Sequence, residues 1–369
     1  MIAYLGLFGA TFLTGLFFET PFKEKEVNRR QDKYFLIVSW LLLSFIEGFR
    51  GLSVGTDTLG YATTYESLDS AYGSYEILSR LLVDFVRLFS KSATVYFVVC
   101  ALLVNGLILM AIYRMSSDKK YSLFLFISLL FYFTSFNALR QAIAYAFMLN
   151  AFYYVRENKI IKFAIFFLIA VGFHSSALIG IVYLLIPLIS WNKKRKVTKR
   201  MTLQTYTSLK NALVLFATFG LSFVAYLWFD DIVQLFAELL PRYEVYLHNS
   251  YRDLAGGIQQ PIVYSAIFVC FVLLVPTNAK YRTAYMLPLS VAVVLSFAAL
   301  KMAYIARLMY YFDITAVIVI PYIYKNSILD RESLKIFKFA VTFICVAFLV
   351  YGLANNYMRV TDYKFIWSD

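Results

Sequence analysis

The chain has 369 residues, of which 61% are hydrophobic and only 15% are charged. Soluble domains are about 45–50% apolar and about 25% charged, so this composition excludes an ordinary soluble protein. The formal net charge of +13 does not require a nucleic-acid partner, because the Lys and Arg residues of membrane proteins concentrate in cytoplasmic loops.

Long apolar runs recur along the whole chain and predict membrane-spanning helices. They are about twice as long as the ~10-residue strands of a membrane barrel, and only helices and closed barrels can span a bilayer. We therefore expect an all-α, polytopic integral membrane protein, with one domain over residues 1–369 and about 12 transmembrane helices. The predicted spans lie near residues 2–18, 34–49, 93–113, 121–136, 141–155, 160–174, 176–190, 211–229, 261–276, 284–300, 308–324 and 336–354.

The first apolar run predicts a retained helix. It has neither a basic stretch before it nor a small-residue cleavage site after it, which argues against a signal peptide.

The distribution of basic residues predicts the orientation. Six alternate loops, 19–33, 114–120, 156–162, 191–210, 277–283 and 325–338, contain 24 of the 35 Lys and Arg residues. The strongest signal is the basic loop 191–210. Because basic loops stay in the cytoplasm, both termini are predicted to lie outside.

Two predicted outer regions are long enough to carry structure of their own. Residues 75–90 have helical periodicity, with a charged stripe of Glu76, Arg80, Asp84 and Arg87 opposite an apolar face, which is typical of a helix lying in the membrane interface. The second region is the outer loop 230–260, which contains Tyr243, Tyr246 and Tyr251.

Charged and polar residues gather at the predicted outer ends of the spans. They are Glu47, Arg50 and Asp57 after the second span, Arg140 after the fourth, His174 after the sixth, and Lys301 and Arg307 after the tenth. The planar guanidinium forms bidentate hydrogen bonds with phosphate. These cations therefore predict an anionic ligand at the outer leaflet.

Each candidate also has a purely structural alternative. Arg50 could pair with Glu47 three residues earlier, Arg140 could extend its side chain to the interface, and Arg307 could pack on the tyrosines that follow it. His174 could be a satisfied buried histidine. The sequence leaves these alternatives open.

Metal and cofactor chemistry is not expected. The chain has two distant histidines and no carboxylate cluster, so we predict neither a metal site nor a cofactor. Cys100, Cys270 and Cys345 each lie in an apolar run, which favours small buried side chains. Neither a nucleotide-phosphate loop nor a serine-hydrolase elbow is found.

Four segments carry a family resemblance. They are Arg50-Gly51 with Val54-Gly55-Thr56-Asp57-Thr58 and Tyr61, then Arg140-Gln141-Ala142-Ile143-Ala144, then KIIKF at 159–163 with Ile169-Ala170 and Phe173-His174-Ser175-Ser176-Ala177-Leu178, and finally Arg307 with Tyr310-Tyr311-Phe312. In order and spacing the chain resembles the EpsG-like, Wzy-type bacterial polysaccharide polymerases over most of its length.

The resemblance implies a multi-span glycosyltransferase of the bacterial cytoplasmic membrane, similar to lipid-donor (GT-C-like) enzymes. Such enzymes join oligosaccharide repeat units, carried on undecaprenyl diphosphate, into O-antigen, capsule or exopolysaccharide at the outer face. The partners implied are the lipid-linked donor and acceptor, the bilayer, and a flippase and chain-length regulator of the same pathway.

The roles we expect combine the resemblance with the chemistry of each residue type. Arg50, Arg140 and Arg307 would hold the pyrophosphate and stabilise it as a leaving group. His174 or Asp57 would take the proton of the acceptor hydroxyl, and an ordinary pKa of about 6.5 slightly favours the histidine. Tyr243, Tyr246 and Tyr251 are candidates for lining a sugar groove.

Two other functions fit the same cations. A flippase for lipid-linked sugars would hold pyrophosphate without a catalytic base, but its charges would follow a path across the membrane. A membrane O-acyltransferase would need a histidine on the cytoplasmic side. The sugars, their linkage and the oligomeric state are not encoded in any pattern we recognise.

Overall fold

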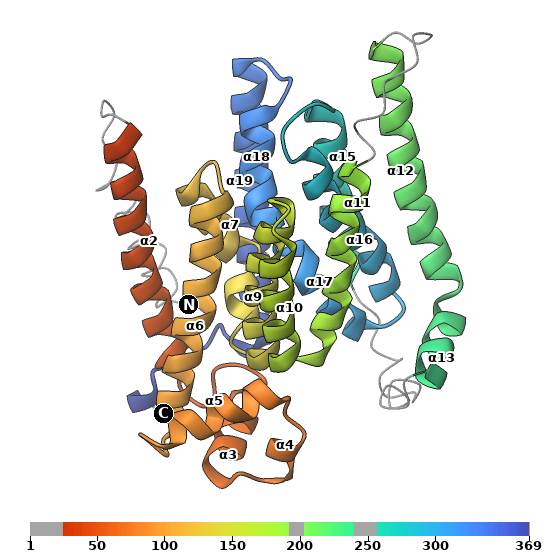
Figure 1. Cartoon of the computed structure of the whole chain (residues 1–369). Coiled ribbons are helices and arrows are strands. Elements are labelled where there is room, and N and C mark those ends of the chain that lie inside the picture. The colour runs from red at the N-terminus through yellow and green to blue at the C-terminus, as the bar shows by residue number, and fades with distance from the viewer. Residues whose placement is uncertain (1–24, 192–202, 240–256, 369) are drawn as a thin grey trace. The chain divides into compact units, whose positions relative to one another are not determined.

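The computed structural model describes residues 25–191, 203–239 and 257–368, and these residues form helices joined by short turns (Figure 1). Within these ranges the β-structure is a single isolated bridge between Arg50 and Phe365. The helices gather into two compact units, which are described separately. The first contains residues 1–154, 159–178 and 335–369, and the second contains residues 155–158 and 179–334.

The first unit contains the helices that carry most of the candidate residues. They are α2 (Lys25–Gly48), α3 (Thr58–Ser67), α4 (Ser70–Gly73), α5 (Ile77–Arg87), α6 (Ala93–Met115), α7 (Lys119–Ser128), α8 (Phe131–Thr134), α9 (Leu139–Arg156), α10 (Ile160–Phe173), α19 (Arg331–Ala354), η5 (Tyr357–Arg359) and η6 (Ile366–Ser368). The last residues of α9 and the first of α19 belong to the second unit.

The second unit is built from the middle of the chain. Its elements are most of the 3₁₀ helix η1 (Ser175–Leu184), then α11 (Leu185–Trp191), α12 (Leu203–Leu227), α13 (Phe229–Leu239), α15 (Gln259–Leu274), α16 (Arg282–Ala299), η4 (Ala303–Ile305), α17 (Ala306–Asp313) and α18 (Ala316–Asn326). Helix α16 packs on α12, α15 and α17.

Several helices of the described chain are long and apolar enough to cross a membrane. Four meet this condition outright, Ala93–Met115, Leu209–Leu227, Arg282–Ala299 and Arg331–Ala354, and a fifth span is formed if the pair Ala303–Asp313 and Ala316–Asn326, bent by 49°, counts as one. Shorter apolar helices cover Ile160–Phe173, Ser175–Ile189 and Gln259–Leu274. The protein is therefore a helical membrane protein, and the number of about 12 spans stays a prediction.

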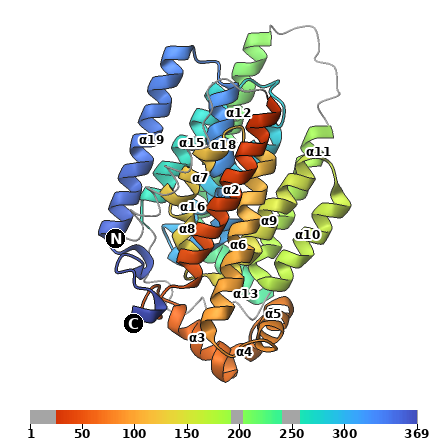
Figure 2. The ribbon, with the colours of Figure 1, turned by 90° about the vertical axis from the view of Figure 1, so that its left-hand side faces the viewer.

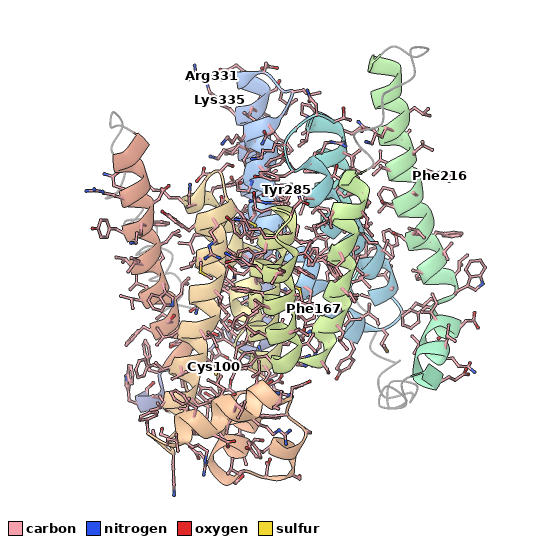
Figure 3. All side chains as sticks on the ribbon, viewed as in Figure 1. Cys100, Phe167, Phe216, Tyr285, Arg331 and Lys335 are labelled. Atoms are coloured by element: carbon pink, nitrogen blue, oxygen red, sulfur yellow. The ribbon has the colours of Figure 1, made fainter. Side chains whose placement is uncertain are left out.

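Apolar side chains point outward from these helices, as expected for surfaces in contact with lipid. Phe216 projects from α12 with 80% of its surface exposed (Figure 3). On α19, Phe339 and Phe343 are exposed to 73% and 66%. The basic residues Arg331 and Lys335 lie at the first turns of the same helix (Figure 3).

Some predicted boundaries differ from the structure. The span 121–136 is divided into α7 and α8, because Leu130 adopts a left-handed conformation with φ 67°. The loop 191–210 becomes helical at Leu203, the start of α12. The region 230–260 begins inside a helix, α13, and its residues 240–256 lie outside the described chain.

In the first unit, α2 runs along α6 and the short helices α3, α4 and α5 gather at one end of α6 (Figures 1 and 2). The two helices approach closely at Gly48, where a Cβ atom would lie 2.8 Å from the Val98 Cα. Glycine is required there because the neighbouring atom belongs to the backbone and cannot rotate away.

We predict that Gly48→Ala destabilises the protein by about 1–3 kcal/mol, the usual effect of overpacking. Thermal unfolding of the detergent-purified protein measures this. The matched control is Gly60→Ala on α3, where an added Cβ would meet nothing within 4 Å. That variant should be as stable as the wild type or gain up to about 1 kcal/mol. Equal losses in both variants would contradict the close packing of α2 on α6.

Candidate functional site

Arg140 lies at the start of α9, at the end of the first unit where α3, α4 and α5 gather. Its side chain is 18% exposed, and its Nη1 donates to the Glu76 carboxylate at 2.6 Å. The guanidinium carbon lies 4.0 Å from the centre of the Tyr75 ring. A carboxylate and an aromatic face therefore hold this arginine in place. A side chain that merely extended to the membrane interface would not need these two partners.

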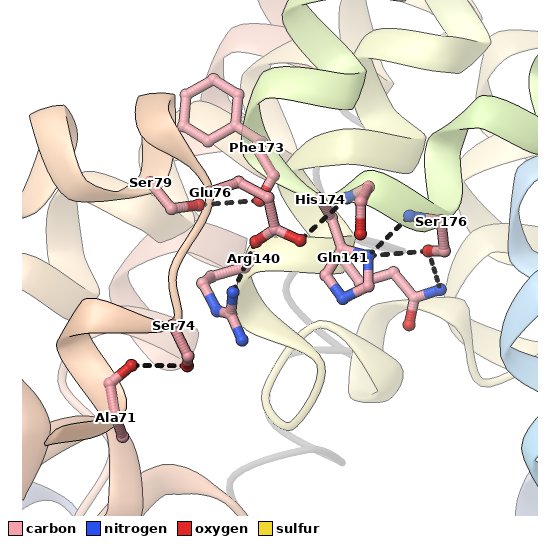
Figure 4. A network of polar contacts seen from close by, with 10 residues as sticks. Ala71, Ser74, Glu76, Ser79, Arg140, Gln141, Phe173, His174 and Ser176 are labelled. Atoms are coloured by element: carbon pink, nitrogen blue, oxygen red, sulfur yellow. Dashed lines mark hydrogen bonds and ion pairs between the residues drawn. The ribbon is translucent and has the colours of Figure 1, made fainter. Parts of the chain in front are cut away.

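Glu76 connects the beginnings of several helices. It occupies the N-cap position of α5, but its carboxylate turns away from that helix. One oxygen accepts from Arg140 of α9, and the other accepts from the backbone N–H of Ser175 at 2.9 Å, where η1 begins (Figure 4). Negative charge is stabilised at helix N-termini. The three segments are thus joined through one carboxylate.

The environment of Glu76 favours its charged form. Burial alone would raise the pKa of this carboxyl, but the Ser175 N–H and the nearby His174 and Arg140 outweigh burial. The pKa of Glu76 therefore lies below its usual value. The ion pair with Arg140 is intact at neutral pH.

His174 follows the last residue of α10 and has extended backbone angles, φ −155° and ψ 121°. Its Nδ1 lies 2.7 Å from the Ser176 Oγ and accepts from the Ser176 N–H at 3.3 Å (Figure 4). The Gln141 Nε2 in turn donates to the Ser176 Oγ at 3.4 Å. Because a backbone N–H can only donate, Nδ1 is an acceptor, and the neutral ring carries its proton on Nε2.

Helix α5 is fixed against the end of α10 that carries His174. The Ser79 Oγ donates to the Phe173 carbonyl at 2.8 Å (Figure 4). A Cβ on Gly172 would lie 2.7 Å from the Leu78 side chain. The side of α5 that contacts the protein thus includes Ser79, with Val83 and Val86, while Ile77, Leu81 and Phe85 are exposed to 61%, 55% and 58%.

Asp57 lies in the turn before α3, at the same end of the unit. The turn requires Gly55, whose φ is +100°. The Asn137 Oδ1 accepts the backbone N–H groups of Thr56 and Asp57, and the Asp57 carboxylate accepts from the Thr56 hydroxyl at 2.9 Å. The Asp57 side chain is partly exposed.

Tyr61 lies one turn after Asp57, on α3, and is close to both Asp57 and Arg140. Its ring centre lies 6.4 Å from that of Tyr75, the ring that Arg140 contacts. Burial raises the pKa of the Tyr61 hydroxyl, the positive charge of Arg140 opposes the shift, and the nearby Asp57 carboxylate adds to it. Through these contacts and those of Glu76, the residues Asp57, Tyr61, Arg140, Glu76 and His174 belong to one polar site, which we call the outer polar site after the side of the membrane that the sequence predicts for it.

Arg50 is held differently from Arg140. Its side chain is completely buried, and its nitrogens donate to the Thr58 hydroxyl at 3.2 Å, the Glu47 carbonyl at 2.5 Å and the Phe136 carbonyl at 3.1 Å. The guanidinium carbon also lies 4.6 Å from the centre of the Phe97 ring. Arg50 therefore joins the end of α2 to the start of α3 and to the segment before Arg140.

The remaining candidates belong to other parts of the chain. Arg307 belongs to the second unit, where its side chain is exposed and its guanidinium carbon lies 5.0 Å from the centre of the Tyr304 ring. Tyr243, Tyr246 and Tyr251 lie outside the described residues. In the described ranges, no group of three or more His, Cys, Asp or Glu residues could hold a metal ion.

Comparison with protein families identifies the chain. The model of the EpsG family matches residues 33–365 of the 369. The chain belongs to the EpsG family. No curated protein and no solved structure matches it. Membership in the EpsG family indicates a membrane-embedded, glycosyltransferase-like protein of the polysaccharide-polymerase type, which acts on lipid-linked substrates.

The contacts of two residues of this EpsG-family protein, Glu76 in the outer polar site and Asn137 beside it, were not expected from its sequence. Periodicity assigned Glu76 to an outward charged stripe, but the helix begins at Ile77 and the carboxylate turns to Arg140. Asn137 gave no signal except its position three residues before Arg140 in SFNALR. Only tertiary contacts show the direction of these two side chains.

We predict that Glu76→Gln lowers the stability of this EpsG-family protein by about 1–3 kcal/mol at pH 7, because Arg140 loses its charged partner. A carboxylate whose pKa is depressed by folding stabilises the protein above its unfolded pKa of about 4.3, and this is lost as the pH falls through the folded value. The difference in unfolding temperature between wild type and variant should therefore shrink below about pH 4. The exposed Asp231→Asn is the control. A pH-independent difference would contradict the ion-pair explanation.

Proposed function

We propose that this protein joins undecaprenyl-diphosphate-linked oligosaccharide repeat units into a surface polysaccharide at the outer face of the bacterial cytoplasmic membrane. The observation that carries this proposal is the guanidinium of Arg140, which Glu76 holds while its other oxygen accepts from the Ser175 N–H next to His174, in an EpsG-family chain. The product would be O-antigen, capsule or exopolysaccharide.

Arg140 is suited to a diphosphate because only part of its guanidinium is engaged. Nη1 is held by Glu76, whereas Nε is buried and has no hydrogen-bond partner among the described residues. An unsatisfied buried donor costs free energy, and a charged oxygen would satisfy it. Tyr75 and Glu76 already hold the guanidinium in place, and neighbouring groups would move apart for a ligand oxygen to reach the buried Nε.

The reaction we propose is a direct displacement. The acceptor hydroxyl oxygen forms a bond to the anomeric carbon of the donor sugar, and the bond from this carbon to the diphosphate oxygen breaks. The hydroxyl proton passes to a carboxylate, and undecaprenyl diphosphate leaves with the electron pair. Arg140 stabilises the charge that develops on the diphosphate.

The contacts favour Asp57 over His174 as the base. The lone pair of neutral His174 lies on Nδ1, which faces the Ser176 N–H and hydroxyl. The protonated Nε2 then donates, which suits a diphosphate oxygen better than an acceptor hydroxyl. Asp57 is partly exposed and its carboxylate accepts from the Thr56 hydroxyl, so it can both orient and deprotonate an acceptor.

The other predicted residues receive different roles. The complete burial of Arg50 supports a positioning role, in which it holds the turn before Asp57 in place. We propose that Arg307 also binds the diphosphate and that Tyr243, Tyr246 and Tyr251 line the sugar groove. Helix 75–90 would border this groove in the outer interface.

The same proposal includes the membrane arrangement and the partners. It comprises about 12 spans, both termini outside, a GT-C-like fold, and a reaction that needs no divalent metal ion. A flippase and a chain-length regulator would act before and with this enzyme.

The deciding experiment has two parts. Purified protein with its lipid-linked repeat unit, in buffer containing EDTA, should give a ladder of products. Deletion in the host should leave single repeat units on the cell surface in place of the ladder. Loss of all surface sugar, with no ladder in vitro, would instead indicate the flippase.

For Arg140, we predict that Arg140→Lys remains folded but polymerises about 10²–10³-fold more slowly, the usual effect of removing a donor to developing negative charge. Lysine keeps a charge for Glu76 but not the planar fork. Initial rates at saturating donor measure this. The control is Arg80→Lys, on the exposed side of α5. Wild-type ladders from both Arg140→Lys and Arg140→Ala would exclude a role for Arg140 in the reaction.

For the base, we predict that Asp57→Asn lowers turnover by about 10²–10⁴-fold with donor affinity nearly unchanged, the usual range for general base catalysis. His174→Gln, whose amide can still donate, should retain more activity than His174→Ala, and only the alanine variant should weaken donor binding. If both histidine variants are inactive with unchanged donor affinity while Asp57→Asn is active, His174 is the base.

A further inference from the structure

The C-terminal segment, residues 356–366, has an unusual backbone. Asn356, Met358 and Arg359 adopt left-handed conformations with φ 49°, 53° and 56°. Asparagine tolerates such angles, but for Met358 and Arg359 they cost about 1–2 kcal/mol each and persist only where surrounding contacts enforce them. These three residues directly follow α19, so contacts beyond the helix must fix this turn.

Two carbonyl groups of the strained turn accept hydrogen bonds from residues beside Asp57 in the outer polar site. The Met358 carbonyl accepts from the Asn137 Nδ2 at 3.3 Å, and the Arg359 carbonyl accepts from the Gly55 N–H at 2.9 Å. The other end of the Asn137 amide accepts the Asp57 N–H at 3.3 Å. The turn therefore touches both the loop that carries Asp57 and the side chain that supports this loop.

The rest of the segment is paired with the end of α2. The Gly51 N–H donates to the Lys364 carbonyl at 2.8 Å, and the Ile366 N–H donates to the Phe49 carbonyl at 3.0 Å. The Tyr363 hydroxyl donates to the Ile46 carbonyl at 2.7 Å. The segment thus runs antiparallel to residues 49–51, immediately before the loop of Asp57.

Aromatic stacking adds to this pairing. The Phe365 and Trp367 rings are stacked with centres 4.5 Å apart and an angle of 7° between them. The Phe45 ring lies 5.8 Å from Phe365, and the Phe49 ring lies 5.9 Å from Trp367. Such pairs contribute about 0.5–1.5 kcal/mol beyond the area they bury. Backbone pairing and stacking together can offset the strain at residues 356–359.

We propose that the C-terminal segment is a positioning element of the outer polar site, which fixes Asp57 through Gly55 and Asn137. That Asp57 is the group positioned for catalysis rests on the proposed polymerase function. The structural coupling between the segment and the loop does not depend on that function. Met358 and Arg359 act through their carbonyl groups, so their side chains are not themselves required. What matters is the sign of φ at these positions.

The test compares substitutions that differ only in their tolerance of positive φ. Arg359→Val and Met358→Val are β-branched and resist the left-handed conformation, whereas Arg359→Gly and Met358→Gly adopt it without strain. The valine variants should lose about 10–10²-fold in turnover, as expected for a misplaced catalytic group, with donor affinity unchanged. The glycine variants should keep wild-type turnover. Asn355→Ala, an exposed residue beside the turn, is the control.

A second readout does not depend on activity. Hydrogen exchange of the peptide covering residues 49–61 should accelerate in the valine variants and stay at the wild-type level in the glycine variants. If a valine variant fails to fold, Tyr363→Phe replaces it, since it removes one hydrogen bond to Ile46 without strain and should shift exchange in the same direction.

The outcomes separate the two proposals. Wild-type exchange and turnover in the valine variants would overturn the positioning role, and so would reduced turnover with wild-type exchange. Equal losses in the glycine and valine variants would show that the side chains act and would also overturn it. Accelerated exchange in the valine variants of a protein whose wild type forms no polymer would refute the polymerase function and leave the structural coupling intact.

Discussion

The outer polar site depends on one ion pair. Arg140 and Glu76 come from segments far apart in the chain, and each is mostly buried, with side chains 18% and 15% exposed. A buried charge without a partner is strongly unfavourable, so each of these residues is tolerated only because the other is present. Since Glu76 also accepts from the Ser175 N–H, the pair sets the position of α5, of the start of α9 and of the turn that carries His174. Ser79 and Gly172 then bring α5 directly against α10.

A second polar junction is built on the same principle beside the first. Arg50 is completely buried, and its donors reach carbonyl or hydroxyl oxygens of Glu47, Thr58 and Phe136. Asn137 supports the turn of Asp57 with its amide oxygen and reaches the C-terminal segment with its amide nitrogen. Apolar contacts between helices leave their ends free to shift, because hydrophobic attraction has no direction. Directed hydrogen bonds between short segments give this end of the unit a defined geometry.

The sequence predicted a helical membrane protein and drew attention to Arg140 and His174, but it did not predict the contacts that join them. Apolar runs located the helices, and a lone charge or histidine at the end of an apolar run singled out Arg140 and His174. Leu130, which divides one predicted span, has no sequence signal, because leucine rarely adopts positive φ. Glu76 shares its helical period with Arg80 and Asp84, and only the point at which α5 begins distinguishes it. The C-terminal segment is paired with residues more than 300 positions earlier, as in the 317-residue separation of Tyr363 and Ile46, which no local pattern encodes.

The ion pair also bears on which anions the site would accept under the proposed function. That proposal places the site at the outer leaflet, where phospholipid headgroups carry phosphodiesters with a single negative charge and would compete for a cation. An arginine without a partner would bind them readily. Glu76 offsets the charge of Arg140, so a monoanion gains little at this position, whereas a diphosphate brings at least two negative charges and several acceptor oxygens. Specificity is a difference between affinities, and a fixed carboxylate lowers the affinity for the weaker anion first. The carboxylate that positions Arg140 would thereby help a polymerase of the EpsG family to distinguish its lipid-linked substrate from the bulk lipid.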